Sequence, residues 1–589
     1  MFTPRRVPPS GSMSKHEFRG LIPRALPLSL VVVSLLVFQV QGTAQIALPP
    51  PQVLENPDPN PEDFFGTSVS LSGGVMAVGS PGDTWPTNSG MWQETVHLYE
   101  LDPSTGDWIA AALDPAISGS VPGEIRNPDC STLPCDPSIP FNTQLSDFGF
   151  SVSVSEDVLA VGAPLYWPGT GCVYLYERWD TGEWKPAEIA LAVAGPFAGQ
   201  ILNPYPSPGK FGLSVSVSGN LLVVGAPATS TFPNPQTSVG GVVWLFERNL
   251  ATGEWEKVET FVNPALQITD AFGTSVSVND ADPGFIGDVI AVGQNVGDGA
   301  VSLYERNQFG VWVAGPTITN PNSSGAAISD RFGEDLSLFD GVLAIGAFAE
   351  DPNNIQNAGS VYLYERAPGP PGAAWNEAII DLTISTAVQG EIPNPDPQSD
   401  DYFGISVSVW GDLLAVGEPG GFLSSSNTSL GAVHLFKRNQ AGEWQPHVEV
   451  QHPNPGNNGD FGYSVAISSS RLAVADPTAS LNNGTLYGHS GEAYLYQLGV
   501  EFRRGDCNND GDVDITDAIG ALMILFVLGG PPDCWDSCDA NDDSTMNIAD
   551  VVFTLGYLFG GGPPPPDPGP VNCGPDPTVD NLDCVSGCL

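Results

Sequence analysis

The chain has 589 residues, of which 41% are hydrophobic, so it can bury a large core or several domains. Its 67 acidic residues outnumber 19 lysines and arginines and give a formal net charge of −48. Such a charge disfavours nucleic acid and anionic membrane surfaces as partners and favours metal cations.

The first 44 residues have the pattern of a secretory signal. Basic residues from Arg5 to Arg24 precede an apolar run from Leu28 to Val40 and a small-residue stretch at 42–44. This pattern predicts cleavage near Ala44 and a secreted, extracellular or cell-surface protein. Because the apolar run is short, we expect no membrane span after cleavage, and an uncleaved anchor stays open as the alternative.

Most of the nine cysteines lie near the C-terminus, at Cys507, Cys534, Cys538, Cys573, Cys584 and Cys588. Export would place them in an oxidising setting, so we expect disulfides. Six cysteines allow many pairings, among which the sequence does not choose. Cys172 lies in an apolar strand pattern and is expected to be a buried thiol outside any disulfide.

A Phe-Gly pair recurs seven times, beginning at Phe65, Phe148, Phe211, Phe272, Phe332, Phe403 and Phe461. Alternating residues such as SVSVS follow each pair and predict a strand with one buried face. The next run, such as VLAVGAP at 158–164, predicts a strand buried on both faces, with glycine where backbones approach closely. A third strand resembles VYLYER at 173–178.

A fourth strand is expected near Trp108, Trp184, Trp255, Trp312, Trp375 and Trp444. Asn-Pro pairs precede all seven Phe-Gly pairs, but the seventh repeat ends at 493–497 with no tryptophan strand after it. We expect residues 45–57 to supply the missing strand and close a ring. The prediction is a mainly β fold: a seven-bladed propeller of four-stranded blades over 45–500. Histidines and aromatics recurring at one position of the third strand, such as His97, His434 and Tyr174, are expected to pack inside blades rather than to stack on sugars.

These repeats resemble the FG-GAP repeat family, the seven-bladed β-propeller of integrin α heads and of many bacterial secreted proteins. The resemblance implies ligand-binding loops on the propeller, with a carbohydrate or a protein as ligand. Integrin-type repeats often carry an acidic calcium loop between the first two strands, whereas the turns here are short. Only the fourth turn is expanded, from Asn279 to Gly287, and we expect an acidic surface loop there in preference to a calcium site.

The segment 504–560 contains a duplicated loop, in which residues 506–517 align with residues 539–550. Oxygen-bearing residues fall at positions 1, 3, 5, 9 and 12, and position 7 adds a backbone carbonyl, which is a spacing that wraps Ca²⁺. The predicted ligands are Asp506, Asn508, Asp510, Asp512, Asp514 and Asp517 for one ion and Asp539, Asn541, Asp543, Thr545, Asn547 and Asp550 for a second. Gly511 suits the sharp turn at position 6 and Ser544 does not, so the second site is expected to be weaker.

A small α-helical part is predicted, with one helix after each loop. The apolar residues at helical spacing are Ile519, Leu522, Met523 and Phe526 in the first copy and Val552, Leu555 and Phe559 in the second. We expect these two faces to pack together.

The duplicated unit resembles a type I dockerin, the calcium-dependent module that binds cohesin domains. The resemblance implies attachment to a cohesin-like or other extracellular protein. The usual Ser-Thr pair at loop positions 10 and 11 is replaced by Ile515-Thr516 and Ile548-Ala549, which leaves the partner open and also allows a purely structural role. Residues 561–589 form a proline-rich spacer and a cysteine-containing tail.

The tripeptide Arg504-Gly505-Asp506 has two interpretations, an adhesion signal or the entry to the first calcium loop, and we expect the metal to claim Asp506. We find no HExxH, GxSxG or phosphate-binding loop and no catalytic cluster, so a non-enzymatic binding protein is expected. Two alternatives remain. One is a component of extracellular polysaccharide breakdown, including a glycosidase whose carboxylates come from distant blades. The other is an adhesion ligand that uses Arg504 to Asp506.

Overall fold

The computed structural model describes residues 48, 50–57, 59, 63–82, 94–102, 107–119, 121–128, 146–165, 170–204, 209–227, 240–263, 271–279, 288–322, 330–384, 386, 388–420, 431–439, 441–454, 459–468, 470–479, 490–498, 502–526, 532, 534–543, 545–566 and 568–571. The predicted signal segment with its cleavage near Ala44 lies outside these residues. So do most of the expanded turn at 280–287, Ser544, and the three cysteines beyond residue 571.

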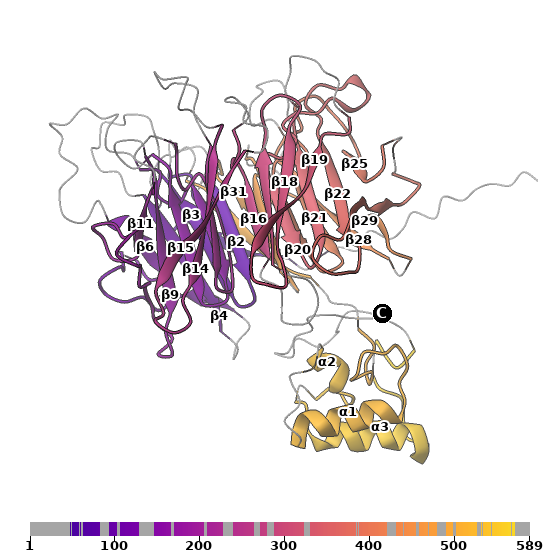
Figure 1. Cartoon of the computed structure of the whole chain (residues 1–589). Coiled ribbons are helices and arrows are strands. Elements are labelled where there is room, and N and C mark those ends of the chain that lie inside the picture. The colour runs from indigo at the N-terminus through magenta and orange to yellow at the C-terminus, as the bar shows by residue number, and fades with distance from the viewer. Residues whose placement is uncertain are drawn as a thin grey trace, which may run out of the picture. The chain divides into compact units, whose positions relative to one another are not determined.

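The described strands form seven sheets, which are the predicted blades (Figure 1). Blade 1 consists of β2 (Ser68–Ser72), β3 (Val75–Ser80), β4 (Thr95–Leu101) and β5 (Trp108–Ala110). Blade 2 consists of β7 (Ser151–Ser155), β8 (Val158–Ala163), β9 (Cys172–Arg178) and β10 (Trp184–Pro186). Blade 3 consists of β12 (Ser214–Ser218), β13 (Leu221–Ala226), β14 (Val242–Arg248) and β15 (Trp255–Val262), and blade 4 consists of β16 (Val276–Asn279), β17 (Val289–Gln294), β18 (Ala300–Arg306) and β19 (Trp312–Thr319).

Blade 5 consists of β20 (Leu336–Phe339), β21 (Val342–Ala347), β22 (Ser360–Arg366) and β23 (Trp375–Glu377). Blade 6 consists of β26 (Val407–Trp410), β27 (Leu413–Glu418), β28 (Ala432–Arg438) and β29 (Glu443–Gln451). Blade 7 consists of β30 (Ser464–Ser468), β31 (Arg471–Asp476), β32 (Glu492–Gln497) and β1 (Gln52–Glu55). The fourth strands begin at or beside the tryptophans, as predicted. In blades 1, 2 and 5 a second short segment also pairs with the third strand, namely β6 (Glu124–Arg126), β11 (Gln200–Leu202) and β25 (Glu391–Pro393). In blade 6 the extra segment β24 (Ile379–Ile380) pairs in parallel with the fourth strand, β29.

The ring closes through the N-terminal strand, as the sequence predicted. Strand β1 pairs antiparallel with β32, from Gln52 opposite Leu495 to Glu55 opposite Glu492. The innermost strands also follow one another without a break, because β2 contacts both β7 of blade 2 and β30 of blade 7. The first and last parts of the propeller therefore share one sheet, which joins the two ends of the ring.

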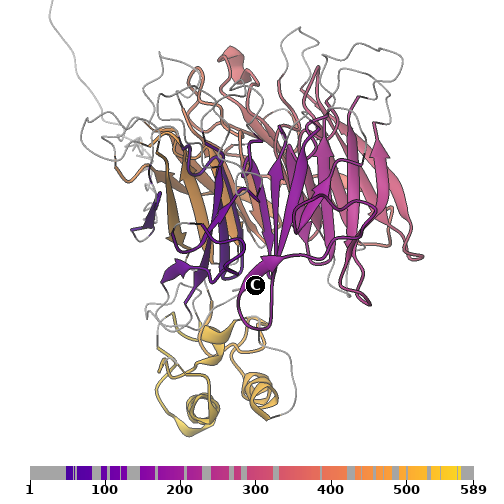
Figure 2. The ribbon, with the colours of Figure 1, turned by 90° about the vertical axis from the view of Figure 1, so that its left-hand side faces the viewer.

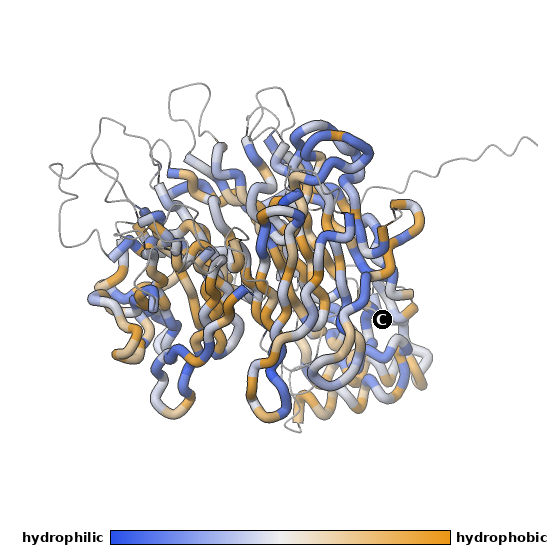
Figure 3. The backbone as a smooth tube through the Cα atoms, turned by 45° about the horizontal axis from the view of Figure 1, so that its top comes forward, coloured by the Kyte–Doolittle hydropathy of each residue, from blue (hydrophilic) through white to orange (hydrophobic). Residues whose placement is uncertain are grey.

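Burial along each blade follows the sequence pattern. Strand β7 alternates between half-buried serine and buried valine, whereas β8 is buried throughout. A side chain at Gly162 of β8 would place its Cβ 2.1 Å from the carbonyl oxygen of Gly212 in the next blade, so only glycine fits there. Figure 3 shows hydrophobic residues gathered along the strands and hydrophilic residues at many connecting turns.

Serines of the innermost strands join neighbouring blades. Each innermost strand is the edge of its sheet, so alternate N–H groups point away from the sheet and need other acceptors. The Ser70 hydroxyl accepts from the backbone N–H of Val154 at 2.9 Å. Five further hydroxyls do the same, in the pairs Ser153–Val217, Ser216–Val278, Ser277–Leu338, Ser337–Val409 and Ser408–Ile467. Blade 7 has Ala466 at this position, so its junction with blade 1 lacks that hydroxyl.

The outer parts of neighbouring blades are joined by ion pairs between a glutamate near the end of one third strand and the arginine at the end of the next. Glu100 of blade 1 accepts from the Trp184 indole N–H of blade 2 at 2.7 Å, and its carboxylate lies 3.1 Å from the Arg178 guanidinium. The same arrangement recurs at Glu177, Glu305 and Glu365. The recurring tryptophans are therefore part of the blade packing.

The recurring position of the third strand is also filled for packing, as expected. Phe148 meets the ring of Tyr174 edge-on, with ring centroids 5.3 Å apart, and the Phe-Gly phenylalanines of blades 1 and 6 contact His97 and His434 in the same way. All three of these third-strand side chains are buried.

The C-terminal module consists of α1 (Ile515–Phe526), α2 (Trp535–Cys538) and α3 (Ile548–Gly560), with α1 packed against α3 (Figure 2). Helix α3 begins with a capping box between Asn547 and Asp550 and ends at Gly561 in the left-handed conformation. The two helices follow their loops as predicted. None of the helices in the described part of the chain is long and apolar enough to cross a membrane.

The prediction of which helix faces pack together was largely wrong. Small residues, Ala518 and Ala521 of α1 with Val551 of α3, form the buried contact, and Leu522 and Leu555 pack against them. Most of the predicted stripe is exposed instead: Ile519, Met523, Phe526, Val552 and Phe559. Small side chains let helices approach closely, and this leaves the larger side chains on the outer faces.

Candidate metal centre

The described residues of the two predicted loops, 506–517 (loop 1) and 539–550 (loop 2), make matching hydrogen bonds. In loop 1 the position 12 carboxylate of Asp517 accepts from the N–H groups of Asn508, at 3.2 Å, and Asp514, at 2.7 Å. In loop 2 Asp550 accepts from the N–H groups of positions 3 and 9, at 3.3 and 2.8 Å. Both loops are thus curled around their last acidic residue, as the duplication predicts.

The position 1 carboxylates lie at the base of each loop. Asp506 is buried and accepts from the N–H groups of Asp510 at 3.1 Å and Gly511 at 2.9 Å. Asp539 is also buried, and it accepts from Asp543 N–H at 3.3 Å. The other predicted ligands of loop 1, Asn508, Asp510, Asp512 and Asp514, are exposed, as are Asp543 and Thr545 of loop 2, whereas Asn541 and Asn547 are half-buried.

Sequence reasoning missed one turn position. Besides Gly511 (φ 90°), position 4 of both loops has left-handed backbone, at Asn509 (φ 55°) and Asp542 (φ 59°). Asparagine and aspartate tolerate this conformation better than other non-glycine residues, so the residue types at position 4 were the available signal.

The acidic residues of each loop are close enough to perturb one another. Burial, together with the nearby carboxylates of Asp506 and Asp510, raises the pKa of Asp517 to about 6. Burial and the carboxylate of Asp539 raise the pKa of Asp550 to about 6 in the same way. Like charges held together by a folded loop are the arrangement that a divalent cation relieves.

The donor set fits a hard cation. Asn541, at position 3 of loop 2, has a side-chain oxygen that is buried and has no hydrogen-bond partner among the described residues. In the part of the chain that the structure describes, no group of three or more His, Cys, Asp or Glu side chains is arranged so that it could hold a metal ion. An ion here would therefore also need amide and backbone carbonyl oxygens, which the twelve-residue pattern supplies for Ca²⁺.

Comparison with known families bears on the propeller. The model described as FG-GAP repeat matches residues 52–91, 322–364 and 388–436. The chain carries FG-GAP repeats in a seven-bladed β-propeller. No curated protein matches the chain. Among solved structures, the crystal structure of the Saccharomyces cerevisiae Sqt1 is similar with a TM-score of 0.38 and 13% identity, over 77% of this chain and 100% of that chain.

Two buried histidines of the propeller, His434 and His452, each pair with a carboxylate. The His434 imidazole lies 2.7 Å from Glu418, and His452 lies 3.1 Å from Asp476 with both side chains fully buried. Burial, together with the neighbouring acids Glu391 and Asp330, raises the pKa of Glu350 to about 7, although the hydrogen bond from the Tyr362 hydroxyl opposes this rise. All of these side chains are buried.

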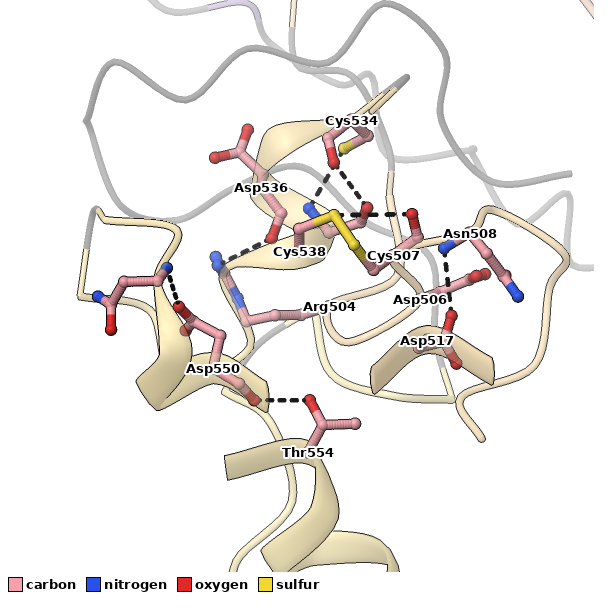
Figure 4. The surroundings of a disulfide bond; sticks show 12 residues. Arg504, Asp506, Cys507, Asn508, Asp517, Cys534, Asp536, Cys538, Asp550 and Thr554 are labelled. Atoms are coloured by element: carbon pink, nitrogen blue, oxygen red, sulfur yellow. Dashed lines mark hydrogen bonds between the residues drawn. A yellow bond between two sulfur atoms is a disulfide. The ribbon is translucent and has the colours of Figure 1, made fainter. Parts of the chain in front are cut away.

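The charged side chains of the Arg-Gly-Asp tripeptide are both buried, Arg504 at 0% and Asp506 at 2% exposure. The Arg504 guanidinium donates to the backbone oxygen of Asp536 (Figure 4). It also donates to the backbone oxygen of Asp539 and lies 3.0 Å from the Asp542 carboxylate. An adhesion receptor must reach both charged groups, so this burial opposes the adhesive interpretation.

The structure also shows one of the cysteine pairings. Cys507 and Cys538 form a disulfide, and Cys534 is disulfide-bonded as well. Cys172 is a buried thiol, as expected, and its sulfur accepts from the Gln200 amide at 3.5 Å. The Cys507–Cys538 bond joins the starts of the two loops, which the spacing of six cysteines could not reveal.

Proposed function

We propose that this is an exported, non-enzymatic binding protein whose propeller presents ligand-binding loops and whose dockerin-like C-terminal module, loaded with two Ca²⁺ ions, attaches it to an extracellular protein. The observation that carries the proposal is the pairing of two matched oxygen-rich loops with two matched exposed apolar stripes. The ions would be held by the donors at positions 1, 3, 5, 7, 9 and 12 of each loop. Bound Ca²⁺ would neutralise the clustered carboxylates and stiffen the loops.

The stripes occupy equivalent positions on the two helices. On α1 they comprise Ile515, Ile519, Met523 and Phe526, and on α3 Ile548, Val552 and Phe559, all between 48% and 70% exposed. Ile548, Val552 and Phe559 each follow their α1 counterpart by the repeat length of the loops. Contiguous exposed apolar side chains on a module rich in acids support a protein partner with an apolar surface, either cohesin-like or of another extracellular class.

Each stripe starts at the residue after position 9 of its loop, so loop order and stripe presentation are linked. Asp517 and Asp550, at position 12, lie in the first turns of α1 and α3. A cation bound to either carboxylate would fix the start of the corresponding helix. Attachment is therefore expected to require calcium.

The calcium part of the proposal is tested on the full chain. Removing Ca²⁺ with EDTA should lower the melting temperature of the helical module, measured by hydrogen exchange of α1 and α3 during heating. The double variant Asp510→Ala/Asp543→Ala should behave in Ca²⁺ as the wild type does in EDTA. Indifference to both treatments would remove the claim.

The attachment part is tested by capture of an extracellular partner with and without Ca²⁺. Ile515→Asp together with Ile548→Asp should abolish calcium-dependent capture while the calcium affinity stays within about threefold. The matched control is Ile379→Asp, which changes an isoleucine of the propeller that is 58% exposed. Equal capture by all three proteins would refute the stripe as the contact, and release of reducing sugar from polysaccharides would favour the degradative alternative.

A further inference from the structure

The segment Arg504–Cys507, here called the strut, lies alongside residues 536–539 and connects the two loops. Gly505 N–H donates to the Ser537 carbonyl at 2.8 Å. Cys507, the neighbour of Asp506, forms the disulfide with Cys538. Because Cys538 directly precedes Asp539, the position 1 ligands of both predicted sites are each one residue from the same covalent bond (Figure 4).

Arg504 extends the connection into loop 2. Although it precedes loop 1, its guanidinium donates to the Asp539 backbone oxygen at 3.1 Å and lies 3.0 Å from the carboxylate of Asp542, at the left-handed position 4. The guanidinium also lies over the Phe502 ring, 5.0 Å from its centroid. A fully buried, stacked guanidinium with several acceptors holds a fixed position, so it fixes the curled backbone at the start of loop 2.

The neighbouring arginine faces the other loop. The Arg503 guanidinium lies 3.9 Å from the carboxylate of Asp506 in loop 1. Two adjacent arginines thus contact the first acidic region of different loops, Arg503 that of loop 1 and Arg504 that of loop 2. This gives the chain an internal control for the role of Arg504.

We propose that the strut couples the two calcium loops, so that filling either loop raises the affinity of the other, and that Arg504 is a positioning residue for loop 2. The inference rests on the proposed calcium binding and adds its regulation. An ion that tightens loop 1 moves Asp506, and that movement passes through the disulfide and the guanidinium to Asp539. Coupling between linked sites typically changes affinity by about 5- to 150-fold and acts equally in both directions.

The coupling is measured by calorimetric Ca²⁺ titration of the full chain. Asp510→Ala leaves loop 2 as the intact site, Asp543→Ala leaves loop 1, and the double variant gives the background from the rest of the chain. The product of the two wild-type association constants should exceed the product of the two single-loop constants at least fivefold. In a Cys507→Ser/Cys538→Ser background this ratio should fall to within twofold of one.

The role of Arg504 is tested by Arg504→Met, which removes the guanidinium contacts but keeps an unbranched apolar stem over Phe502. It should weaken loop 2 at least tenfold, measured with Asp510→Ala, and change loop 1 by less than twofold, measured with Asp543→Ala. Arg503→Met should leave loop 2 within twofold of the wild type. Hydrogen exchange of α1 and α3 in saturating Ca²⁺ checks that each variant keeps its helices.

The outcomes separate this inference from the function on which it rests. If the wild type shows no more calcium binding than the double-loop variant, the calcium proposal fails and the coupling fails with it. If the wild type binds two ions, but the product of its two association constants equals the product of the two single-loop constants, only the coupling is overturned. If Arg504→Met and Arg503→Met affect loop 2 equally, the positioning role of Arg504 is refuted.

Discussion

Replacing Glu305 by glutamine should destabilise the propeller far more than the same change at Glu247, although both residues occupy the same position of the repeat. Glu305 of blade 4 meets Arg366 of blade 5, and both side chains are 1% exposed. Its carboxylate also accepts from Gly372 N–H and from the Trp375 indole. Burial alone would raise the pKa of Glu305, but these hydrogen bonds and the charge of Arg366 lower it, so the carboxylate is ionised at neutral pH.

The size of the effect follows from what remains around each arginine. Without the negative charge of Glu305, the buried Arg366 guanidinium keeps the backbone oxygens of Gly369 and Pro370 as acceptors but has no charge opposite it, and breaking a buried ion pair in this way costs about 3–5 kcal/mol. Glu247 and its partner Arg306 are 33% and 22% exposed. Arg306 also lies 3.1 Å from Asp288, so losing Glu247 should cost about 0–1 kcal/mol.

Native-state hydrogen exchange is the suitable assay, because a ring of this size need not unfold in two states. The slowest amides of β22 should exchange at least about thirtyfold faster in Glu305→Gln than in Glu247→Gln, since about 1.4 kcal/mol corresponds to a factor of ten. Equal acceleration in the two variants would refute the reasoning that burial, rather than the Glu-Arg sequence, sets the strength of these junctions.

Three further predictions concern the loops and the blade junctions. Asp517 and Asp550 have a raised pKa of about 6, against 3.8 for the ordinary group. In EDTA, the stability that these two groups contribute is therefore complete below about pH 4 and is lost as the pH rises through 6. The helical module should therefore melt lower at pH 7 than at pH 5 in EDTA, while calcium affinity, which needs ionised carboxylates, should be higher at pH 7; a melting temperature that rises with pH in EDTA would contradict this. Ser216→Ala should lower the free energy of unfolding by about 1–3 kcal/mol, because the Val278 N–H loses its acceptor. Ala466→Ser should stabilise the junction of blades 7 and 1. Both effects are measured by hydrogen exchange of the innermost strands, and no change in either variant would mean that water replaces the hydroxyl. Gly162→Ala should lower the melting temperature because its Cβ would meet the Gly212 carbonyl, whereas a neutral result would show that blades 2 and 3 can separate slightly.

The repeated part of the fold could be predicted because each blade contains the same signals at the same spacing. The strands β7 and β8 could be placed from the alternation in SVSVS and from the continuous apolar run VLAVGA. The pairing of β1 with β32 could be predicted from the absence of a seventh tryptophan strand. Period and count are properties of the sequence itself. What the serines do was not predicted, because an alternating pattern shows which face is polar but not that Ser153 accepts from an N–H of the next blade.

The helix faces were not predictable from apolar spacing alone. Ile519 and Ala518 are adjacent, and hydrophobicity favours burial of the larger residue, yet Ala518 is 3% exposed and Ile519 is 49% exposed. The choice depends on how closely α1 approaches α3, and Cys507 and Cys538 lie in the same buried cluster as Ala518 and Val551. A patch of large apolar residues on the surface is therefore more informative than a single one, since single exposed apolar residues are common on soluble proteins.

The Arg-Gly-Asp tripeptide shows why a short motif has no meaning apart from burial. In an exposed loop its two charges would be available to a receptor, but here Gly505 (φ 100°) turns the backbone so that Arg504 points at loop 2 and Asp506 at loop 1. Moving either charge to the surface would break the contacts that curl both loops. The adhesive use and the calcium use of this segment are thus physically exclusive. A chain with the Asp506→Glu substitution that lost cell attachment while keeping full calcium affinity would reverse the argument.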